Sequence, residues 1–102
     1  MQPDERLLRQ IISDVEHLVA RNDWETTPRR QMVFLLREVI ELAEEVLRLP
    51  VAGPYDAGDR QRIGREIYDV LWNACAVARS AGVDVLTAAA DKRRVNESRV
   101  WP

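Results

Sequence analysis

The sequence has 102 residues, enough for one domain (residues 1–102) and too few for a second. Hydrophobic residues make up 46% and charged residues 31%, which excludes an intrinsically disordered chain. The formal net charge of −2 gives no electrostatic basis for nucleic-acid binding as the main task. One cysteine and one histidine exclude an internal disulfide and a zinc site. With no signal peptide in the polar residues 2–10 and no apolar run near the ~20 residues of a membrane span, we expect a cytoplasmic protein without membrane contact.

The first predicted helix covers residues 3–21. Pro3 suits the first turn of a helix, and Asp4 and Glu5 follow near the positive end of the helix dipole. Apolar residues then recur at steps of three and four, which predicts a single apolar stripe consisting of Leu7, Leu8, Ile11, Ile12, Val15, Leu18 and Val19. Asn22 and Asp23 are expected to end the helix.

The second predicted helix begins at the pair Thr27-Pro28, a capping hydroxyl followed by proline at the first helical position. It is expected to run to about Leu49, because Pro50 follows. Its apolar residues are dense and cover more than one face between Met32 and Leu49. Such a helix packs on several neighbours, more than three short helices provide. We therefore expect at least a homodimer.

Two further helices are predicted after a loop. Residues 50–58 contain two prolines and two glycines, which indicates a loop. Asp59 is predicted to cap a third helix that runs to about Ser80, with Gly82 as its C-terminal stop. Asp84 is predicted to cap a fourth helix over residues 85–98. The predicted fold is all-α, with four helices and no strands.

Acidic residues repeat at three-residue steps in the second and third predicted helices. Glu38 and Glu41 share one helix face, as do Glu66 and Asp69, and Asn73 lies one turn further along the latter face. If the two helices pack antiparallel, the four carboxylates converge. Hard divalent cations take oxygen ligands, Mg²⁺ also binds substrate phosphates, and helical bundles can host carboxylate metal sites. We therefore predict a Mg²⁺ site, with Mn²⁺ as a substitute.

Surface-exposed pairs are the alternative interpretation of these acids, because the same spacing occurs by chance in many charged helices. The surroundings favour a site. The segments LLREVIELAEEV and REIYDVLW are mostly apolar around their acids, whereas a solvent-facing stripe is normally flanked by Lys, Arg and Gln. No histidine lies three residues after a glutamate ligand, which argues against a di-iron site and for an all-oxygen magnesium site.

These segments resemble the MazG-like superfamily of all-alpha NTP pyrophosphohydrolases. LLREVIELAEEV is similar to the first metal helix of that family, and EIYDVLWNACAVARSAGVDV to the second metal helix and the turn after it. DKRRVNESRVWP resembles the closing segment, and NDWETTPRR the entry to the metal helix in the dCTP pyrophosphatase branch. The resemblance covers roughly residues 5–102 and implies a four-helix bundle completed by dimerisation.

The resemblance also implies roles for single residues. By position, Glu38, Glu41, Glu66 and Asp69 match the Mg²⁺ ligands. The positions that match substrate contacts are Lys92, Asn96, Arg99 (for phosphate) and Trp24 (near the base). Asn73 is a further candidate substrate contact because it lies on the metal face, not because of the resemblance. A solvated helix end is the alternative for Lys92 and Arg99, and a core or interface aromatic for Trp24. His17 does not match a functional position and is interpreted as a surface residue.

The sequence departs from the family around the expected base pocket. Ile40, Tyr68 and Asn73 replace a small residue, a Gly or Ser and an aromatic residue, respectively, and the Phe-His pair that follows the tryptophan in dCTP-type members is missing. Because these departures lie around the base pocket, the preferred base and sugar of the substrate stay open. The metal ligands are intact.

Together, the acids and the resemblance predict a Mg²⁺-dependent hydrolase of acid anhydrides. It would convert a nucleoside triphosphate into the monophosphate and pyrophosphate, and so clear unwanted (deoxy)nucleotides. A water activated by the metal would attack phosphorus in line, with one of the four carboxylates or Glu45 as the base. The resemblance implies a homodimer or a dimer of dimers with the nucleotide pocket near the subunit boundary. Phosphoribosyl-ATP pyrophosphohydrolase activity and a non-catalytic, nucleotide-sensing or protein-binding helical dimer are the alternatives.

Overall fold

The computed structural model describes residues 3–22 and 27–101. These ranges contain four helices, α1 (Pro3–Asn22), α2 (Pro28–Leu47), α3 (Ala57–Ser80) and α4 (Val85–Ser98), and no strand. The predicted all-α fold and the order of its helices are confirmed. None of these helices combines the length and apolar composition that crossing a membrane requires.

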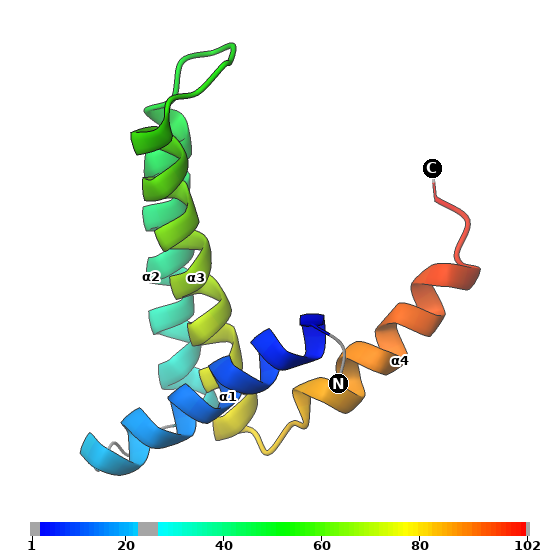
Figure 1. Ribbon diagram of the computed structural model, residues 1–102. Coiled ribbons are helices and arrows are strands. Elements are labelled where there is room, and N and C mark those ends of the chain that lie inside the picture. The colour runs from blue at the N-terminus through cyan, green and yellow to red at the C-terminus, as the bar shows by residue number, and fades with distance from the viewer. Residues whose placement is uncertain (1–2, 23–26, 102) are drawn as a thin grey trace.

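The helices are arranged around one long hairpin (Figure 1). α2 and α3 run antiparallel and pack closely along their length, joined by the loop at one end of the hairpin. α1 crosses the opposite end, where it packs on α3. α4 contacts α1 and extends away from the hairpin. The described helices of one chain therefore do not close into a four-helix bundle.

Capping explains where most helices begin. Thr27 caps α2 as predicted, because its Oγ1 accepts a hydrogen bond from the Arg30 backbone N–H at 3.2 Å. Asp84 caps α4 as predicted: the Thr87 backbone N–H donates to its Oδ1, also at 3.2 Å. This hydrogen bond holds the pKa of Asp84 below its usual value.

The prediction that Asp59 caps the third helix is wrong. The N-cap of α3 is Asp56, whose Oδ1 accepts from the Asp59 backbone N–H at 2.7 Å. Asp59 returns the contact by accepting from the Asp56 backbone N–H at 3.4 Å, which completes a capping box. Two aspartates three residues apart can each start a helix. The earlier one prevails here because the later one fits the third position of the box.

Helix ends follow local chemistry. α2 ends at Leu47, two residues before the predicted end, with Arg48 as its C-cap, and Pro50 disfavours helical geometry at Leu49. Gly82 ends α3 as predicted and adopts a positive φ of 69°. The backbone N–H of Val83 donates to the Ala78 carbonyl at 2.8 Å, and that of Gly82 to the Arg79 carbonyl at 3.2 Å, the two bonds of a Schellman motif.

The buried core is small and lies where α1 crosses α3. Its members are Ile11, Val15 and Val19 of α1 with Cys75 and Ala76 of α3. The apolar stripe predicted for the first helix is thus confirmed in its centre, although Leu7 at its start is 57% exposed. Burial raises the pKa of the Cys75 thiol, which makes this cysteine a packing residue rather than a nucleophile.

α2 exposes most of its apolar residues. One side of the helix, here called the α2 apolar face, consists of Met32, Val33, Leu36, Val39, Ile40, Val46 and Leu47, all exposed. Ile67 and Leu71 of α3 are also exposed. At 3.6 residues per turn, the α2 apolar face and the side that carries Glu38 and Glu41 point in different directions from the helix axis. The hairpin therefore has an acidic side and an apolar side.

Candidate active site

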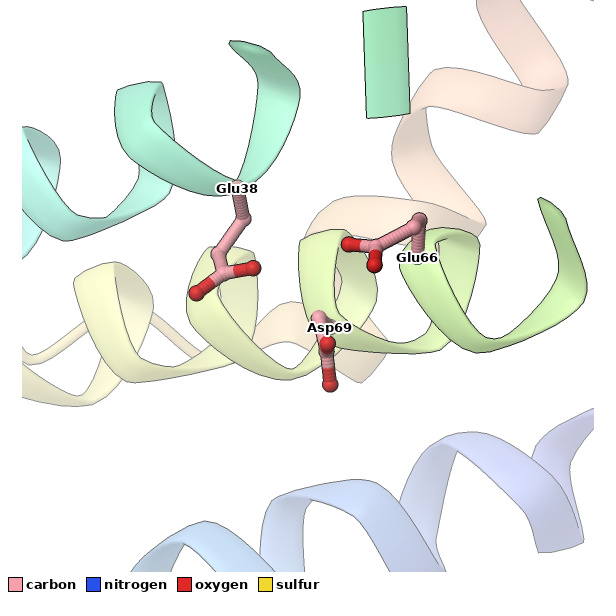
Figure 2. Close-up of side chains that lie close together, drawn as sticks. All are labelled: Glu38, Glu66 and Asp69. Atoms are coloured by element: carbon pink, nitrogen blue, oxygen red, sulfur yellow. The ribbon is translucent and has the colours of Figure 1, made fainter. Parts of the chain in front are cut away.

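Three of the four predicted metal ligands converge between α2 and α3. Glu38 of α2 and Glu66 and Asp69 of α3 each offer a carboxylate oxygen, and these oxygens all lie within 4.8 Å of one another (Figure 2). Glu66 and Asp69 project from the same face of α3 because they are three residues apart. The antiparallel packing of the hairpin brings Glu38 opposite them. Among the described residues, this is the group of acidic, histidine or cysteine side chains that could hold a metal ion.

Burial leaves two oxygens of this acidic cluster without a partner. Glu38 and Glu66 are half-buried, and the Oε2 atom of each is buried without a hydrogen-bond donor within the described residues. An ionised carboxylate is costly to bury unless a donor or a cation satisfies it. Two such oxygens in one cluster of acids fit a site that could bind a cation.

The electrostatics of the acidic cluster agree with this geometry. Burial is the largest cause that raises the pKa of Glu38, followed by a hydrogen bond with Glu41 and the charges of Glu41, Asp69 and Glu66. Burial also raises the pKa of Glu66, followed by the charges of Glu41 and Asp69. The neighbouring carboxylates therefore oppose the ionisation of Glu38 and Glu66, as like charges gathered at one place do.

Glu41 stands at the edge of the acidic cluster. It is half-buried and interacts with Glu38, but it is not part of the group whose oxygens lie within 4.8 Å. Glu45, one turn further along α2, is engaged elsewhere. Its carboxylate pairs with Arg48 at 2.9 Å and, across the hairpin, with Arg62 at 3.6 Å. These two guanidinium groups make Glu45 a poorer candidate base than the sequence suggested.

A groove with a volume of about 620 Å³ adjoins the acidic cluster. It lies between α1 and α3, and Asp69 belongs both to its wall and to the cluster. Asn73, predicted to contact substrate, lines the groove, and its Nδ2 donates to the Asp69 carbonyl at 2.8 Å. The remaining walls include Gln10, Asp14 and His17 of α1 and Tyr68 and Trp72 of α3. His17 is exposed, as predicted, although it borders this groove.

The other predicted substrate residues lie apart from the acidic cluster. Lys92 and Asn96 are on α4, which extends away from the α2–α3 hairpin (Figure 1). Lys92 is exposed, whereas Asn96 is half-buried with an unpartnered Oδ1. Arg99 follows α4, and its guanidinium carbon lies 4.4 Å from the centre of the Trp101 ring. Trp24 lies outside the described residues.

Comparison with known proteins finds one informative similarity. No protein-family model matches the chain. Over 90 residues, the sequence is 33% identical to a dATP/dGTP diphosphohydrolase of Salmonella phage PMBT28. The match covers 88% of this chain but 28% of the phage protein, so the chain spans less than a third of that relative.

The acidic cluster fits a hard divalent cation. Its ligand atoms would be carboxylate oxygens from two facing helices, and Glu38 and Glu66 each carry a buried oxygen without a hydrogen-bond partner. An oxygen-only donor set suits Mg²⁺ or Mn²⁺ and disfavours softer metals that prefer nitrogen or sulfur. The arrangement can therefore hold a cation that in turn holds an anionic substrate.

Sequence reasoning missed the part that α1 plays at this site. Gln10 and Asp14 line the groove and are joined by a hydrogen bond of 3.0 Å from Gln10 Nε2 to Asp14 Oδ1. Their spacing of four residues beside the apolar stripe places both on one polar side of α1. That spacing was visible in the sequence. Which polar side faces the acids depends on how α1 crosses α3, and local periodicity does not encode this crossing.

Proposed function

We propose that this chain is a Mg²⁺-dependent nucleoside triphosphate pyrophosphohydrolase of the MazG-like superfamily. Its products would be a nucleoside monophosphate and pyrophosphate. The observation that carries the proposal is the convergence of Glu38, Glu66 and Asp69 with two buried oxygens left unpartnered. The similarity to the phage dATP/dGTP diphosphohydrolase supports it and makes dATP and dGTP the first substrates to test.

In this proposal the acidic cluster binds the cation and thereby the phosphates. Glu38, Glu66 and Asp69 are the ligands, and Glu41, next to Glu38, is the fourth. When bound, Mg²⁺ supplies positive charge against the phosphate oxygens and makes an attacking water more acidic. The proton of that water passes to a carboxylate of the cluster, since Glu45 is paired with Arg48 and Arg62. These carboxylates therefore orient the substrate and accept the proton.

We further propose that two copies of the chain complete the fold. The chain exposes 7981 Å² of surface, whereas a compact monomer of 11.8 kDa exposes about 5,900 Å². The excess of about 2,000 Å² is larger than the roughly 800 Å² that each partner buries in a standard interface. The α2 apolar face, with Ile67 and Leu71, supplies apolar contact surface for a second copy.

A dimer also gives the residues of α4 a place at the site. Within one chain, α4 extends away from the acidic cluster (Figure 1). We propose that Lys92, Asn96 and Arg99 act near the subunit boundary, where lysine and arginine bind phosphate oxygens. The half-buried Asn96 with its unpartnered Oδ1 is consistent with an unmet contact on α4.

The test is pyrophosphate release by the purified protein. The common nucleoside and deoxynucleoside triphosphates, together with phosphoribosyl-ATP, are assayed at fixed Mg²⁺ and again in EDTA. Glu38→Gln removes a proposed ligand. Glu44→Gln removes a neighbouring, exposed acid of the same helix and serves as the matched control.

The proposal expects Mg²⁺-dependent release of pyrophosphate that Glu38→Gln abolishes and Glu44→Gln leaves within about twofold. Turnover of phosphoribosyl-ATP alone would replace the proposed substrate class. A folded protein that binds nucleotide without turnover, and is indifferent to Glu41→Gln, would overturn the enzymatic proposal in favour of a binding dimer.

A further inference from the structure

The groove between α1 and α3 begins where the acidic cluster ends. Asp69 belongs to both, so a ligand whose phosphates are held at the acids can extend directly into the groove. The volume of about 620 Å³ lies within the range of small-molecule sites. In the proposed function, on which this inference rests, the part of the substrate that remains beyond the phosphates is the nucleoside.

One hydrogen-bond acceptor in the groove is held in position. The Asp14 carboxylate is half-buried, and Gln10 donates to its Oδ1 at 3.0 Å from one turn earlier on α1. Asp14 and Tyr68 both line the groove, from α1 and α3 respectively. An ionised carboxylate accepts about four hydrogen bonds, so Asp14 keeps acceptor capacity for a ligand.

The walls beside Asp14 suit a flat ring. Tyr68 and Trp72 of α3 contribute aromatic surface to the groove, and Trp72 is half-buried and packs against the core, which limits its movement. Aromatic side chains bind planar heterocycles by offset stacking. A ring that lies here presents its edge to the acceptor Asp14. The ligand class that fits is a heteroaromatic base with N–H donors along one edge.

We propose that this groove binds the base of the substrate and that Asp14 determines base specificity in favour of guanine. Guanine carries two adjacent donors, the ring N1–H and the exocyclic 2-amino group, which a single carboxylate can accept in parallel. Adenine offers one amino group beside a ring acceptor that a carboxylate would repel. Thymine has one N–H between two carbonyl oxygens. Asp14 is therefore a specificity residue rather than a metal ligand.

The experiment measures binding rather than turnover. Calorimetric titrations in Mg²⁺ compare α,β-imido analogues of dGTP and dITP, because hypoxanthine differs from guanine only by the missing 2-amino group. Wild-type protein is expected to bind the dGTP analogue roughly tenfold more tightly, the factor typical of one hydrogen bond to a charged group. Asp14→Asn replaces the carboxylate with a side chain of nearly the same shape and should bind the two analogues with nearly equal affinity. Glu5→Gln, which changes an exposed acid of the same helix, should keep the wild-type preference for the dGTP analogue.

A second variant tests how Asp14 is positioned. Gln10→Ala leaves the Asp14 carboxylate in place but removes the hydrogen bond that orients it. The preference for the dGTP analogue over the dITP analogue should therefore become weaker but not disappear. The inference is overturned if wild-type protein binds both analogues equally or if Asp14→Asn keeps the wild-type preference for the dGTP analogue. It is also overturned if the α,β-imido analogue of dATP, titrated in the same way, binds wild-type protein more tightly than the dGTP analogue does.

These outcomes are separable from the proposed function. If the protein discriminates between bases through Asp14 but never releases pyrophosphate, base binding in the groove is supported and the proposed hydrolase activity is refuted. If pyrophosphate release depends on Glu38 but its base preference is unchanged in Asp14→Asn, the hydrolase activity is supported and the role of Asp14 is refuted.

Discussion

Glu38 of α2 and Glu66 of α3 face each other across the hairpin, with ligand oxygens within 4.8 Å and a buried, unpartnered Oε2 on each. Nothing in the packing of two helices requires this arrangement, and electrostatic repulsion opposes it. Burial, the contact with Glu41 and the neighbouring charges, including that of Glu66, together raise the pKa of Glu38. The pair therefore destabilises the metal-free fold, and a dication bound between the two carboxylates would offset their repulsion.

The first prediction separates a catalytic role from a structural role for these acids. Glu38→Gln or Asp69→Asn should lower pyrophosphate release at least about 100-fold, since each removes a proposed ligand of the cation that binds the reacting phosphates. The same variants should melt at the same or a higher temperature than wild type in EDTA, because one repelling charge is gone. Circular-dichroism melts beside the activity assay check this. Unfolding of both variants would identify the carboxylates as structural.

The second prediction concerns the pH dependence of metal-free stability. Glu38 and Glu66 have pKa values raised above the ordinary 4.5, so the folded state binds protons more tightly than the unfolded chain. Stability should therefore be greatest at or below pH 4.5 as far as these groups are concerned, and should fall as pH rises through the raised pKa values. Asp84 acts in the opposite sense. Its pKa is lowered from 3.8, so its contribution is lost only in more acidic solution.

Melts in EDTA between pH 4.5 and 8 measure this dependence. The melting temperature of wild type should fall relative to that of a Glu38→Gln, Glu66→Gln double variant as the pH rises. Parallel curves for the two proteins would show that the acidic cluster does not repel itself in solution.

The third prediction is that Mg²⁺ or Mn²⁺ stabilises the fold at neutral pH. A cation at 100 times its Kd adds about 2.7 kcal/mol, which raises the melting temperature of a domain of this size by several degrees. Asp69→Asn should lose most of this gain. Glu41→Gln should keep part of it, because Glu41 lies outside the group of converging oxygens. Equal losses in the two variants would mean that Glu41 contributes as much to cation binding as Asp69 does.

The fourth prediction tests the second copy. Ile40 is 57% exposed in the centre of the α2 apolar face. Ile40→Glu should convert the protein to a monomer and lower its melting temperature, because a buried charge without a partner opposes association. Light scattering after size exclusion gives the mass. Val51→Glu, at a fully exposed residue of the loop between α2 and α3, is the control that should leave the mass unchanged. A wild-type protein that is itself monomeric would remove the proposed interface.

Much of the fold was predictable because its signals are local. The stripe from Ile11 to Val19 follows helical periodicity, and the caps Thr27 and Asp84 each use a side chain that satisfies the backbone of its own helix. The start of α3 was misplaced because Asp56 and Asp59 offer equivalent chemistry, and only their mutual hydrogen bonds decide between them.

The candidate site was predictable only as far as one hairpin reaches. Glu66 and Asp69 share a helix face by spacing alone, and an antiparallel hairpin places Glu38 opposite them. Glu41 fits the same pattern, yet its oxygens are not part of the converging group. Asp14 was missed because it joins the site through the crossing of α1 over α3, a tertiary feature. In the proposed dimer, the place of Lys92 and Asn96 would depend on contacts beyond one chain.

The last prediction concerns the turn that sets the direction of α4. Gly82 has a φ of 69°, and the Val83 backbone N–H bonds to the Ala78 carbonyl only if this residue is left-handed. A Cβ there meets nothing within 4 Å, so the cost of a substitution is conformational rather than steric against neighbours. Gly82→Ala should lower the free energy of unfolding by about 1 to 2 kcal/mol. Gly82→Asn should cost less, because asparagine tolerates left-handed geometry. Urea unfolding of both variants measures the difference, and equal losses would mean that the strain does not lie in φ.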